Sequence, residues 1–163
     1  MTLKRSFAAV TDSRTRVLIL GRLPGERSLA AQEYYAHPGN RFWELVGAVV
    51  ERDLRSLPYV PRLAALNAAG IGLWDVIETG RRDGSLDAAI RDETANDLAG
   101  LVATLPKLAA IAFNGQKAAT VAARQRIDFG GRALVVLPSS SAAHASVSFT
   151  AKRERWLELR NYL

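Results

Sequence analysis

The chain contains no cysteine, a single methionine and only two histidines among its 163 residues. Without cysteine it cannot form disulfides, use a thiol in catalysis or hold an iron–sulfur cluster through thiolates. His37 and His144 are too few to indicate a zinc site, so we expect no metal and no cofactor. No apolar run approaches the roughly 20 residues that span a bilayer, and the N-terminus lacks the apolar core of a signal peptide. We therefore expect a protein of the bacterial cytoplasm that does not enter membranes.

Charge of one sign predominates in the sequence. Lysine and arginine number 22 against 16 acidic residues, which makes the formal net charge +6 and the isoelectric point about 10.2. Surface cations gain affinity for phosphate backbones by releasing counterions, so DNA is a candidate partner. An arginine-rich proteome explains the same composition. The charge therefore permits nucleic-acid binding without establishing it.

Four short apolar runs recur along the chain, at residues 17–20, 71–77, 108–113 and 133–137. Each is continuous rather than alternating, which is typical of parallel strands buried on both faces. Helical patterns occur between and after them, at residues 42–50, 61–69, 94–105, 116–126 and 151–163, with Thr94 or Asn96 as the expected cap of the third. Strands alternating with helices predict an α/β fold, a three-layer α/β/α sandwich around a mostly parallel four-stranded sheet.

No repeat, low-complexity tract or linker divides the chain. With 48% hydrophobic residues, a chain of this length can bury roughly 70% of its unfolded surface in one core. We expect a single domain over residues 1–163 that acts as a monomer. Residues 1–15 carry no clear pattern, and we expect them to be loosely ordered.

The loops after the predicted strands carry the residues suited to chemistry. The first loop is Gly21-Arg22-Leu23-Pro24-Gly25, and the aromatic-rich segment from Tyr34 to Trp43 follows it closely. Two later loops contain Asn114 and the serines after Pro138. The carboxyl ends of parallel strands meet at one edge of a sheet, where ligands bind. Aromatic faces, amide edges and glycine backbone suit a flat heterocycle, so we predict a nucleobase site.

These motifs resemble the uracil-DNA glycosylase superfamily. Gly-x-x-Pro-Gly followed by Ala-His-Pro-x-Asn-Arg-Phe-Trp, here residues 36–43, is similar to the first motif region of mismatch-specific uracil/thymine DNA glycosylases. Further matches at residues 70–77, 84–87, 113–115 and 137–141 bring the chain closer to the DNA-deoxyinosine (hypoxanthine) glycosylases. The resemblance runs from about Arg16 to the C-terminus. It implies that a deaminated base, hypoxanthine above all, is flipped from DNA and removed by hydrolysis during base excision repair.

The resemblance identifies Asn40 as the catalytic residue. In mismatch-specific relatives, the amide that positions water lies inside the first loop, where this chain has Leu23. The deoxyinosine branch shares that loss, and there the asparagine before Arg-Phe-Trp is implicated, which is Asn40 here. A neutral amide can hold a water while departure of the base drives the reaction. The simpler alternative is that Asn40 caps the following helix, and the two roles are compatible.

The resemblance also implies which residues bind the base and the DNA. Tyr35 matches a base-stacking aromatic, and Asn114 has the donor and acceptor faces to recognise a base edge, although Asn-Gly is also a turn signal. The base-binding set is Gly21, Arg22, Leu23, Pro24, Gly25, Tyr35 and Asn114. Residues 138–144 match the second motif of the superfamily, a loop that enters the minor groove and contacts phosphates. The DNA-binding set is Ser28, Pro138, Ser139, Ser140, Ser141 and His144.

Some residues depart from the pattern or allow other interpretations. Ala142 stands where a proline is commoner, and Leu137 where other branches carry a histidine that assists the leaving base. Asp75 could rival Asn40, but helix capping or pairing with Arg81 or Arg82 is the commoner role of such a residue, so we leave it out of the catalytic set. Asp87 suits the start of a helix. No lysine lies in the motif loops, and Lys117 is placed in a helix, so we expect hydrolysis without a lyase step.

Three other functions remain open on the sequence alone. Uracil or a G·T or G·U mismatch could be the substrate. Leu23 could mark a nucleic-acid-binding module that has lost catalysis. A small enzyme of free nucleosides would make the basic charge incidental.

Overall fold

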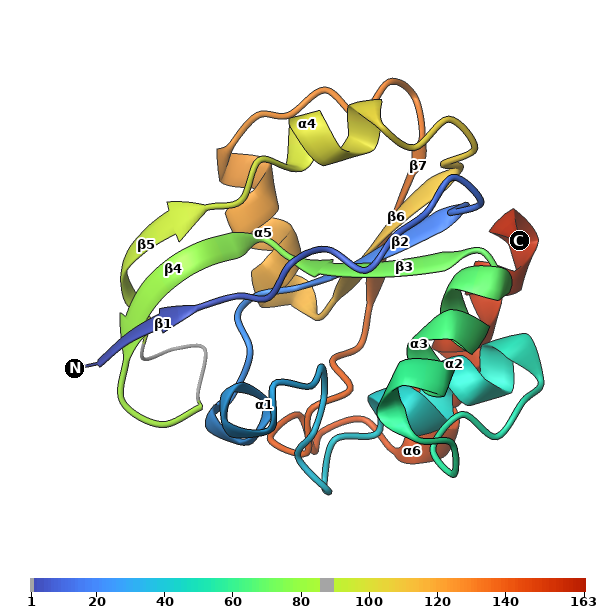
Figure 1. Cartoon of the computed structure of the whole chain (residues 1–163), viewed down its shortest axis with the longest axis horizontal. Coiled ribbons are helices and arrows are strands. Elements are labelled where there is room, and N and C mark those ends of the chain that lie inside the picture. The colour runs from blue at the N-terminus through green and yellow to red at the C-terminus, as the bar shows by residue number, and fades with distance from the viewer. Residues whose placement is uncertain (1, 86–89) are drawn as a thin grey trace.

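The core of the molecule is a parallel sheet whose strands run in the order β3-β2-β6-β7. The computed structural model describes residues 2–85 and 90–163. The strands are β2 (Val17–Gly21), β3 (Ile71–Asp75), β6 (Ala110–Asn114) and β7 (Ala133–Leu137). Helices lie on both sides of this sheet (Figure 1). The predicted three-layer α/β/α architecture is confirmed, and each of the four apolar runs overlaps one of these strands.

The two faces of β2 belong to two separate hydrophobic clusters. Val17 and Ile19 face the cluster that includes residues of α2 (Phe42–Val50), α3 (Tyr59–Ala68) and α6 (Phe149–Leu157). Leu18 and Leu20 face the cluster that includes α4 (Leu98–Ala103) and α5 (Gln116–Arg124). Because helices cover both faces, every position of the strand is buried. This is the physical reason for a continuous apolar run in the sequence.

A second, antiparallel sheet was not predicted. It has the order β1-β4-β5, with β1 (Thr2–Arg5), β4 (Ile77–Arg82) and β5 (Arg91–Ala95). The N-terminal segment was expected to be loosely ordered. Instead, its strand β1 pairs with β4, and Val10 forms a β-bridge with Leu73. Every residue of β5 is exposed. Such a strand has no buried face to leave an apolar pattern in the sequence.

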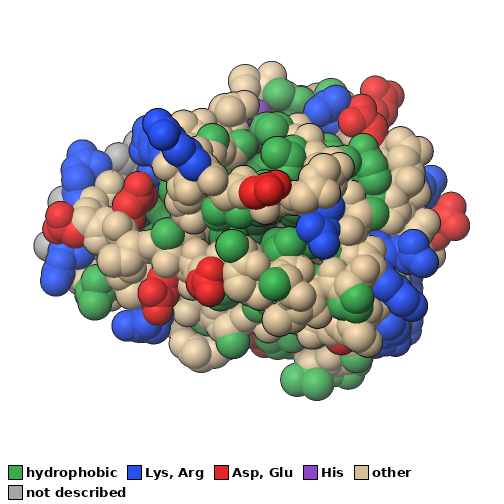
Figure 2. All heavy atoms as spheres, turned by 90° about the horizontal axis from the view of Figure 1, so that it is seen from above, with side chains coloured by type: hydrophobic (Ala, Val, Ile, Leu, Met, Phe, Trp, Pro, Cys, Tyr) green, Lys and Arg blue, Asp and Glu red, His purple; other side chains and the backbone are tan. Residues whose placement is uncertain are grey.

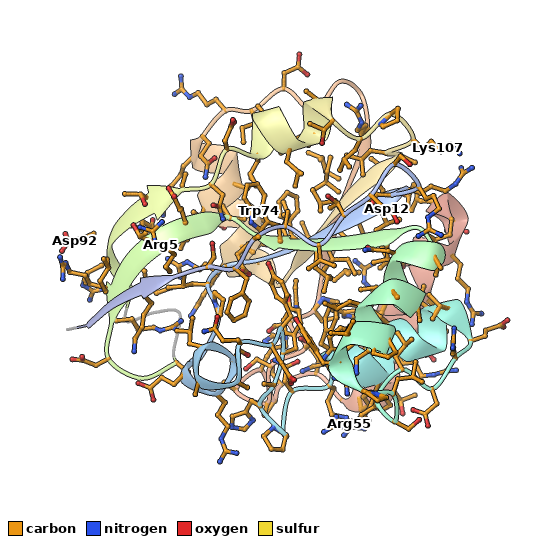
Figure 3. All side chains as sticks on the ribbon, viewed as in Figure 1. Arg5, Asp12, Arg55, Trp74, Asp92 and Lys107 are labelled. Atoms are coloured by element: carbon orange, nitrogen blue, oxygen red, sulfur yellow. The ribbon has the colours of Figure 1, made fainter. Side chains whose placement is uncertain are left out.

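The apolar run 71–77 is therefore two strands rather than one. Val76 separates them, and its N–H donates to the Gly21 carbonyl at 2.8 Å. Trp74, labelled in Figure 3, is only partly buried. Its Nε1 donates to the Phe7 carbonyl at 2.9 Å. Both contacts tie the end of β3 to neighbouring segments, which places Asp75 at the sheet edge.

The predicted helices are present but differ at their ends, and α1 (Glu26–Ala31), which follows the first motif loop, was not predicted. The caps predicted for α4, Thr94 and Asn96, are both wrong. Asp97 caps that helix by accepting from the Gly100 N–H at 2.9 Å. Thr94 lies in β5, and Asn96 donates to the Asp75 carbonyl at 2.8 Å. The last predicted helix is α6, capped by Ser148, followed by a 3₁₀ turn, Glu158–Tyr162.

The strand order places a topological switch point between β2 and β6. From β2 the chain moves to β3 on one side and later to β6 and β7 on the other, which is where open α/β sheets bind ligands. The face in Figure 2 carries basic side chains towards both ends, with apolar side chains between them. Within the described residues, no helix has the length and apolar character needed to cross a bilayer.

Candidate active site

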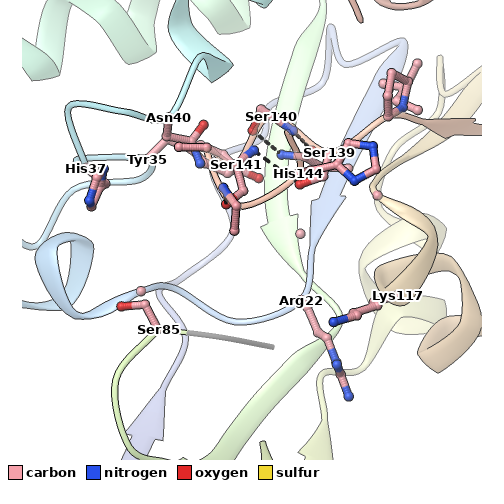
Figure 4. A pocket seen from close by; sticks show the side chains of 18 of the residues that line it. Arg22, Tyr35, His37, Asn40, Ser85, Lys117, Ser139, Ser140, Ser141 and His144 are labelled. Atoms are coloured by element: carbon pink, nitrogen blue, oxygen red, sulfur yellow. Dashed lines mark hydrogen bonds between the residues drawn. The ribbon is translucent and has the colours of Figure 1, made fainter. Parts of the chain in front are cut away.

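A cavity of about 890 Å³ lies at the carboxyl ends of the parallel strands. Each strand contributes its last residue: Gly21, Asp75, Asn114 and Leu137. Every site residue predicted from the sequence also lines this cavity, several of them labelled in Figure 4. The switch-point rule and the family resemblance therefore predict the same site at the carboxyl ends of the strands. The roles of the individual residues remain predictions, which the contacts below support to different degrees.

Asn40 lies on the cavity wall, and its side chain also bonds the first turn of α2, whose N-cap position is the next residue, Arg41. Its Oδ1 accepts from the Phe42 N–H at 3.0 Å, which satisfies one of the free donors at the start of that helix. Its own N–H donates to the His37 carbonyl at 3.0 Å. Among the described residues this leaves the second lone pair of Oδ1 and the Nδ2 hydrogens for a bound water. Both interpretations of Asn40 are thus sterically compatible.

Tyr35 is held rigidly beside Asn40. Its ring stacks on that of Phe42, with centroids 3.8 Å apart and planes 15° from parallel. Its backbone has φ 54°, in the left-handed region. Ser28, expected to contact DNA, is buried, and its hydroxyl accepts from the Ala36 N–H at 3.0 Å. Ser28 thereby supports the loop that carries Tyr35, and its contact with DNA stays a prediction.

Gly21 ends β2 in a crowded position. A Cβ on this residue would lie 2.6 Å from Asp75 Oδ1 and 3.0 Å from the Tyr35 hydroxyl. Only a residue without a side chain allows both oxygens to approach the strand end so closely. This packing explains the glycine at the start of the first motif loop.

Asp75 is a buried carboxylate on the cavity wall, only 3% exposed. Burial, and secondarily the charge of Asp75, raise the pKa of the Tyr34 phenol. Of the arginines expected to pair with Asp75, Arg81 forms an ion pair with Asp92 at 3.8 Å. Arg82 donates to the carbonyls of Pro24 and Gly84. The available sequence signal for Asp75 was its place at the end of an apolar run.

Asn114 ends β6 and is joined to Ser140 in the loop after β7. The Ser140 N–H donates to Asn114 Oδ1, and Asn114 Nδ2 donates to Ser140 Oγ, both at 2.8 Å. Ser140 has no exposed surface. Its hydroxyl is engaged by Asn114, and its predicted contact with DNA stays a prediction.

The remaining residues of the second motif lie around the cavity. Pro138, Ser139, Ser141 and His144 all line it. The loop is anchored from α6, where Lys152 Nζ donates to the Ser141 carbonyl at 3.3 Å. Lys152 is almost completely buried, and this burial, followed by the nearby charge of Arg41, lowers its pKa.

Cationic side chains also line the cavity. Figure 4 shows Arg22 and Lys117 on the side away from Asn40 and Ser140. Arg22 pairs with Glu93 at 3.5 Å. Lys117 and Arg155, which were not predicted to belong to the site, also line the cavity. Lys117 was recognisable by its place just after the strand-ending Asn114-Gly115.

No group of histidine and carboxylate side chains suited to a metal ion occurs in residues 2–85 and 90–163. The motif at residues 84–87 includes Ser85, whose Oγ accepts from the Glu26 N–H at 2.9 Å. Leu86 and Asp87 of that motif lie outside the described residues, as does the helix start expected at Asp87.

Comparison with known proteins agrees with this geometry. The profile of the "Uracil DNA glycosylase superfamily" matches residues 8–161. A hypoxanthine DNA glycosylase of Methanosarcina acetivorans is 44% identical over 152 residues, covering 93% of this chain and 95% of the relative. One from Methanosarcina barkeri is 39% identical over 155 residues, covering 95% and 96%.

A solved structure shows the same fold. It is the solution NMR structure of a candidate uracil DNA glycosylase from M. acetivorans, 42% identical, with a TM-score of 0.86 over 99% of both chains. These relatives are archaeal, so a bacterial origin remains only a prediction. Sequence profile, relatives and fold agree that the chain belongs to the uracil DNA glycosylase superfamily.

Proposed function

We propose that this protein removes hypoxanthine from DNA by hydrolysing its N-glycosidic bond, as the first step of base excision repair. The observation that carries the proposal is the convergence of Asn40, Tyr35 and Asn114, from separate parts of the chain, on one cavity. Two relatives named hypoxanthine DNA glycosylases match over nearly the whole chain. The cavity lies within the size range of pockets that enclose small molecules.

Tyr35 is the surface on which the flipped base stacks. Phe42 covers one face of its ring at 3.8 Å and, being buried, fixes the orientation of that ring. An extruded base then stacks on the other face of the Tyr35 ring, from the cavity side. Such stacking contributes roughly 1–3 kcal/mol per base in proteins that bind single strands. Asn114 reads the base edge with the donor and acceptor that Ser140 does not use.

Asn40 holds the attacking water below the sugar. Its capping bond to the Phe42 N–H fixes the amide, so the water is oriented without further ordering. The water oxygen bonds to C1′ as the bond from C1′ to N9 breaks, and the electron pair leaves on N9. A proton from the water is finally transferred to the departing purine. The neutral amide orients the water and does not remove its proton.

The cations on the cavity wall serve the DNA backbone. Arg27 and Lys117 are exposed and line the cavity, so they can reach the phosphates beside a flipped nucleotide. The loop of Pro138, Ser139 and Ser141 fills the space that the nucleotide leaves.

A substrate comparison tests this function. Labelled oligonucleotides containing hypoxanthine, uracil, xanthine or a G·T mismatch are incubated with the protein, and abasic sites are cleaved with alkali. We expect release of hypoxanthine, with single strands and wobble pairs at least as good as stable pairs, because flipping costs less there. Robust uracil release without hypoxanthine release would assign the protein to mismatch repair. Binding without any release would indicate a non-catalytic module.

A further inference from the structure

The side chain of Lys152 is buried against the loop that joins β7 to α6, which can be followed in Figure 1. It extends from α6, and its Nζ donates to the Ser141 carbonyl at 3.3 Å. The same carbonyl accepts from the His144 N–H at 3.1 Å, which closes a turn over residues 141–144. Two donors from different segments therefore fix the direction in which this carbonyl points.

A carbonyl that is fixed in this way also fixes the N–H of the next residue. In a trans peptide the two groups point in opposite directions, so the Ala142 N–H points away from Lys152. Ala142 is exposed and lines the cavity. Among residues 2–85 and 90–163, no group accepts a hydrogen bond from its N–H. The loop thus presents a backbone donor on its cavity side.

The surroundings of Lys152 are short of negative charge. Within the described residues, its ammonium group bonds a carbonyl and no carboxylate. Burial, followed by the charge of nearby Arg41, lowers the pKa of Lys152. Glu44, the acidic partner of Arg41, is shared with Arg55. An anion held by the loop would therefore meet a positive potential that these side chains leave unbalanced.

We propose that Lys152 is a positioning residue that aims the Ala142 N–H at a DNA phosphate beside the flipped nucleotide. The fixed peptide supplies the donor, and the buried charge behind it strengthens the hydrogen bond to an anion. The inference rests on the proposed function, which places this loop against DNA. It adds to that function a specific donor and the buried cation that orients it.

Substitutions can remove the donor and the cation separately. Ala142→Pro removes the N–H and suits the turn 141–144, because proline is favoured at the second position of such turns. Ala142→Ser alters the side chain and keeps the N–H. Lys152→Met removes the charge and the bond to Ser141. Arg153→Met is its control, because Arg153 is an exposed cation next to it on α6.

Equilibrium binding tests the contact without catalysis. The probe is a duplex with a tetrahydrofuran analogue of an abasic site, and undamaged duplex of the same sequence gives the non-specific affinity. We expect Ala142→Pro to reduce the preference for the abasic duplex about tenfold, the effect of one hydrogen bond to a charged group. Lys152→Met should reduce it about fivefold, because the donor remains but is no longer held or charged. Ala142→Ser should lose much less, and Arg153→Met should keep the preference.

The double variant tests whether Lys152 acts through Ala142. Once Ala142→Pro has removed the N–H, adding Lys152→Met should have almost no further effect on the preference. Losses that multiply in the double variant overturn the link between the two residues. A wild-type preference that Ala142→Pro keeps in full, or that Ala142→Ser loses equally, overturns the role of the N–H.

Other outcomes separate this inference from the proposed function. A wild type that binds both duplexes equally overturns the recognition of an extruded nucleotide and the contact with it. A wild type that prefers the abasic duplex, shows the expected variant effects and releases no hypoxanthine overturns the proposed substrate while supporting the contact.

A measurement on the wild type needs no variant to fold. In nitrogen–proton NMR spectra, the Ala142 amide signal should move downfield when the abasic duplex is added, because its N–H gains a strong acceptor. It should move less with a duplex in which neutral methylphosphonates replace the phosphates that flank the abasic site. A signal that stays in place, or that moves equally with the neutral duplex, overturns the phosphate contact.

Discussion

Asn40 combines a stabilising role with the proposed catalytic one, and substitutions can separate the two. Asn40→Ala removes both the cap to Phe42 and the amide that holds water. Asn40→Ser keeps a cap but is too short to reach the water, and Asn40→Asp keeps the cap and can still bind it. We expect the alanine and serine variants to lose about a hundredfold or more in single-turnover base release, while the aspartate variant retains part of it. Thermal or urea unfolding should rank them differently, with only the alanine variant lower by about 1 kcal/mol.

The opposite outcome is equally informative. If the Asn40→Ser variant turned over at the wild-type rate while the alanine variant only unfolded more easily, Asn40 would be a cap alone. Asp75, buried on the same wall, would then be the first candidate to hold the water.

A substitution at Gly21 gives a second prediction at the residue scale. In Gly21→Ala the new methyl group would meet Asp75 Oδ1 at 2.6 Å and the Tyr35 hydroxyl at 3.0 Å, in a buried position. We expect a loss of about 1–3 kcal/mol in the free energy of unfolding, as for other overpacked sites. Base release should weaken as well, because Tyr35 is displaced.

Gly25→Ala is the control for this change, since it lies in the same loop and its Cβ would come no closer than 3.2 Å to Ser85. Urea unfolding and single-turnover assays of both variants decide the matter. Equal losses in the two variants would show that the close approach of Asp75 and Tyr35 to Gly21 is unimportant.

At the scale of elements, α6 supports the second motif loop through a buried cation. Burial, with a smaller contribution from Arg41, lowers the pKa of Lys152 below its value in the unfolded chain. Between the folded pKa and the usual value of about 10.4, the unfolded state binds more protons. Burial of Lys152 therefore destabilises the folded protein least at high pH. The free energy of unfolding of the wild type, relative to that of Lys152→Met, should rise as pH increases towards 10.

The measurement is urea unfolding of both proteins at several pH values from 7 to 10. Lys107→Met is the control because Lys107 is exposed, and its difference from the wild type should change little with pH. A difference between wild type and Lys152→Met that stays flat, or falls, contradicts the lowered pKa.

At the scale of the whole molecule, the net charge of +6 should appear as salt-dependent DNA binding. The logarithm of the association constant for undamaged duplex should fall linearly with the logarithm of salt concentration, by roughly 0.9 per neutralised phosphate. Lys117→Gln and Arg27→Gln, from the cavity wall, should each reduce that slope by about one. The exposed Lys107→Gln, outside the cavity, should not. A flat response in the wild type would favour free nucleosides as substrates.

The predictability of the fold follows from burial. β2 is covered on both faces, so its sequence is apolar along nearly its whole length. That continuous apolar run was enough to predict a buried strand from the sequence. β5 is exposed along its whole length, and β1 makes its partner pairing through the backbone, so neither left a readable pattern. The cap of α4 was misplaced because Asn96, a good cap by type, is drawn to the carbonyls of Asp75 and Ile77 instead.

The sequence alone determined the class of fold, the edge of the sheet that carries the site, and the residue types that reach it. These depend on local apolar pattern and on the rule that parallel strands end together. Only the tertiary structure decided the partners of each polar group. It turned Ser28 and Ser140 inward and brought Asp75 onto the cavity wall. Hydrogen-bond partners such as Asn114 and Ser140 are separated by 26 residues, and no local signal specifies such a distant pairing.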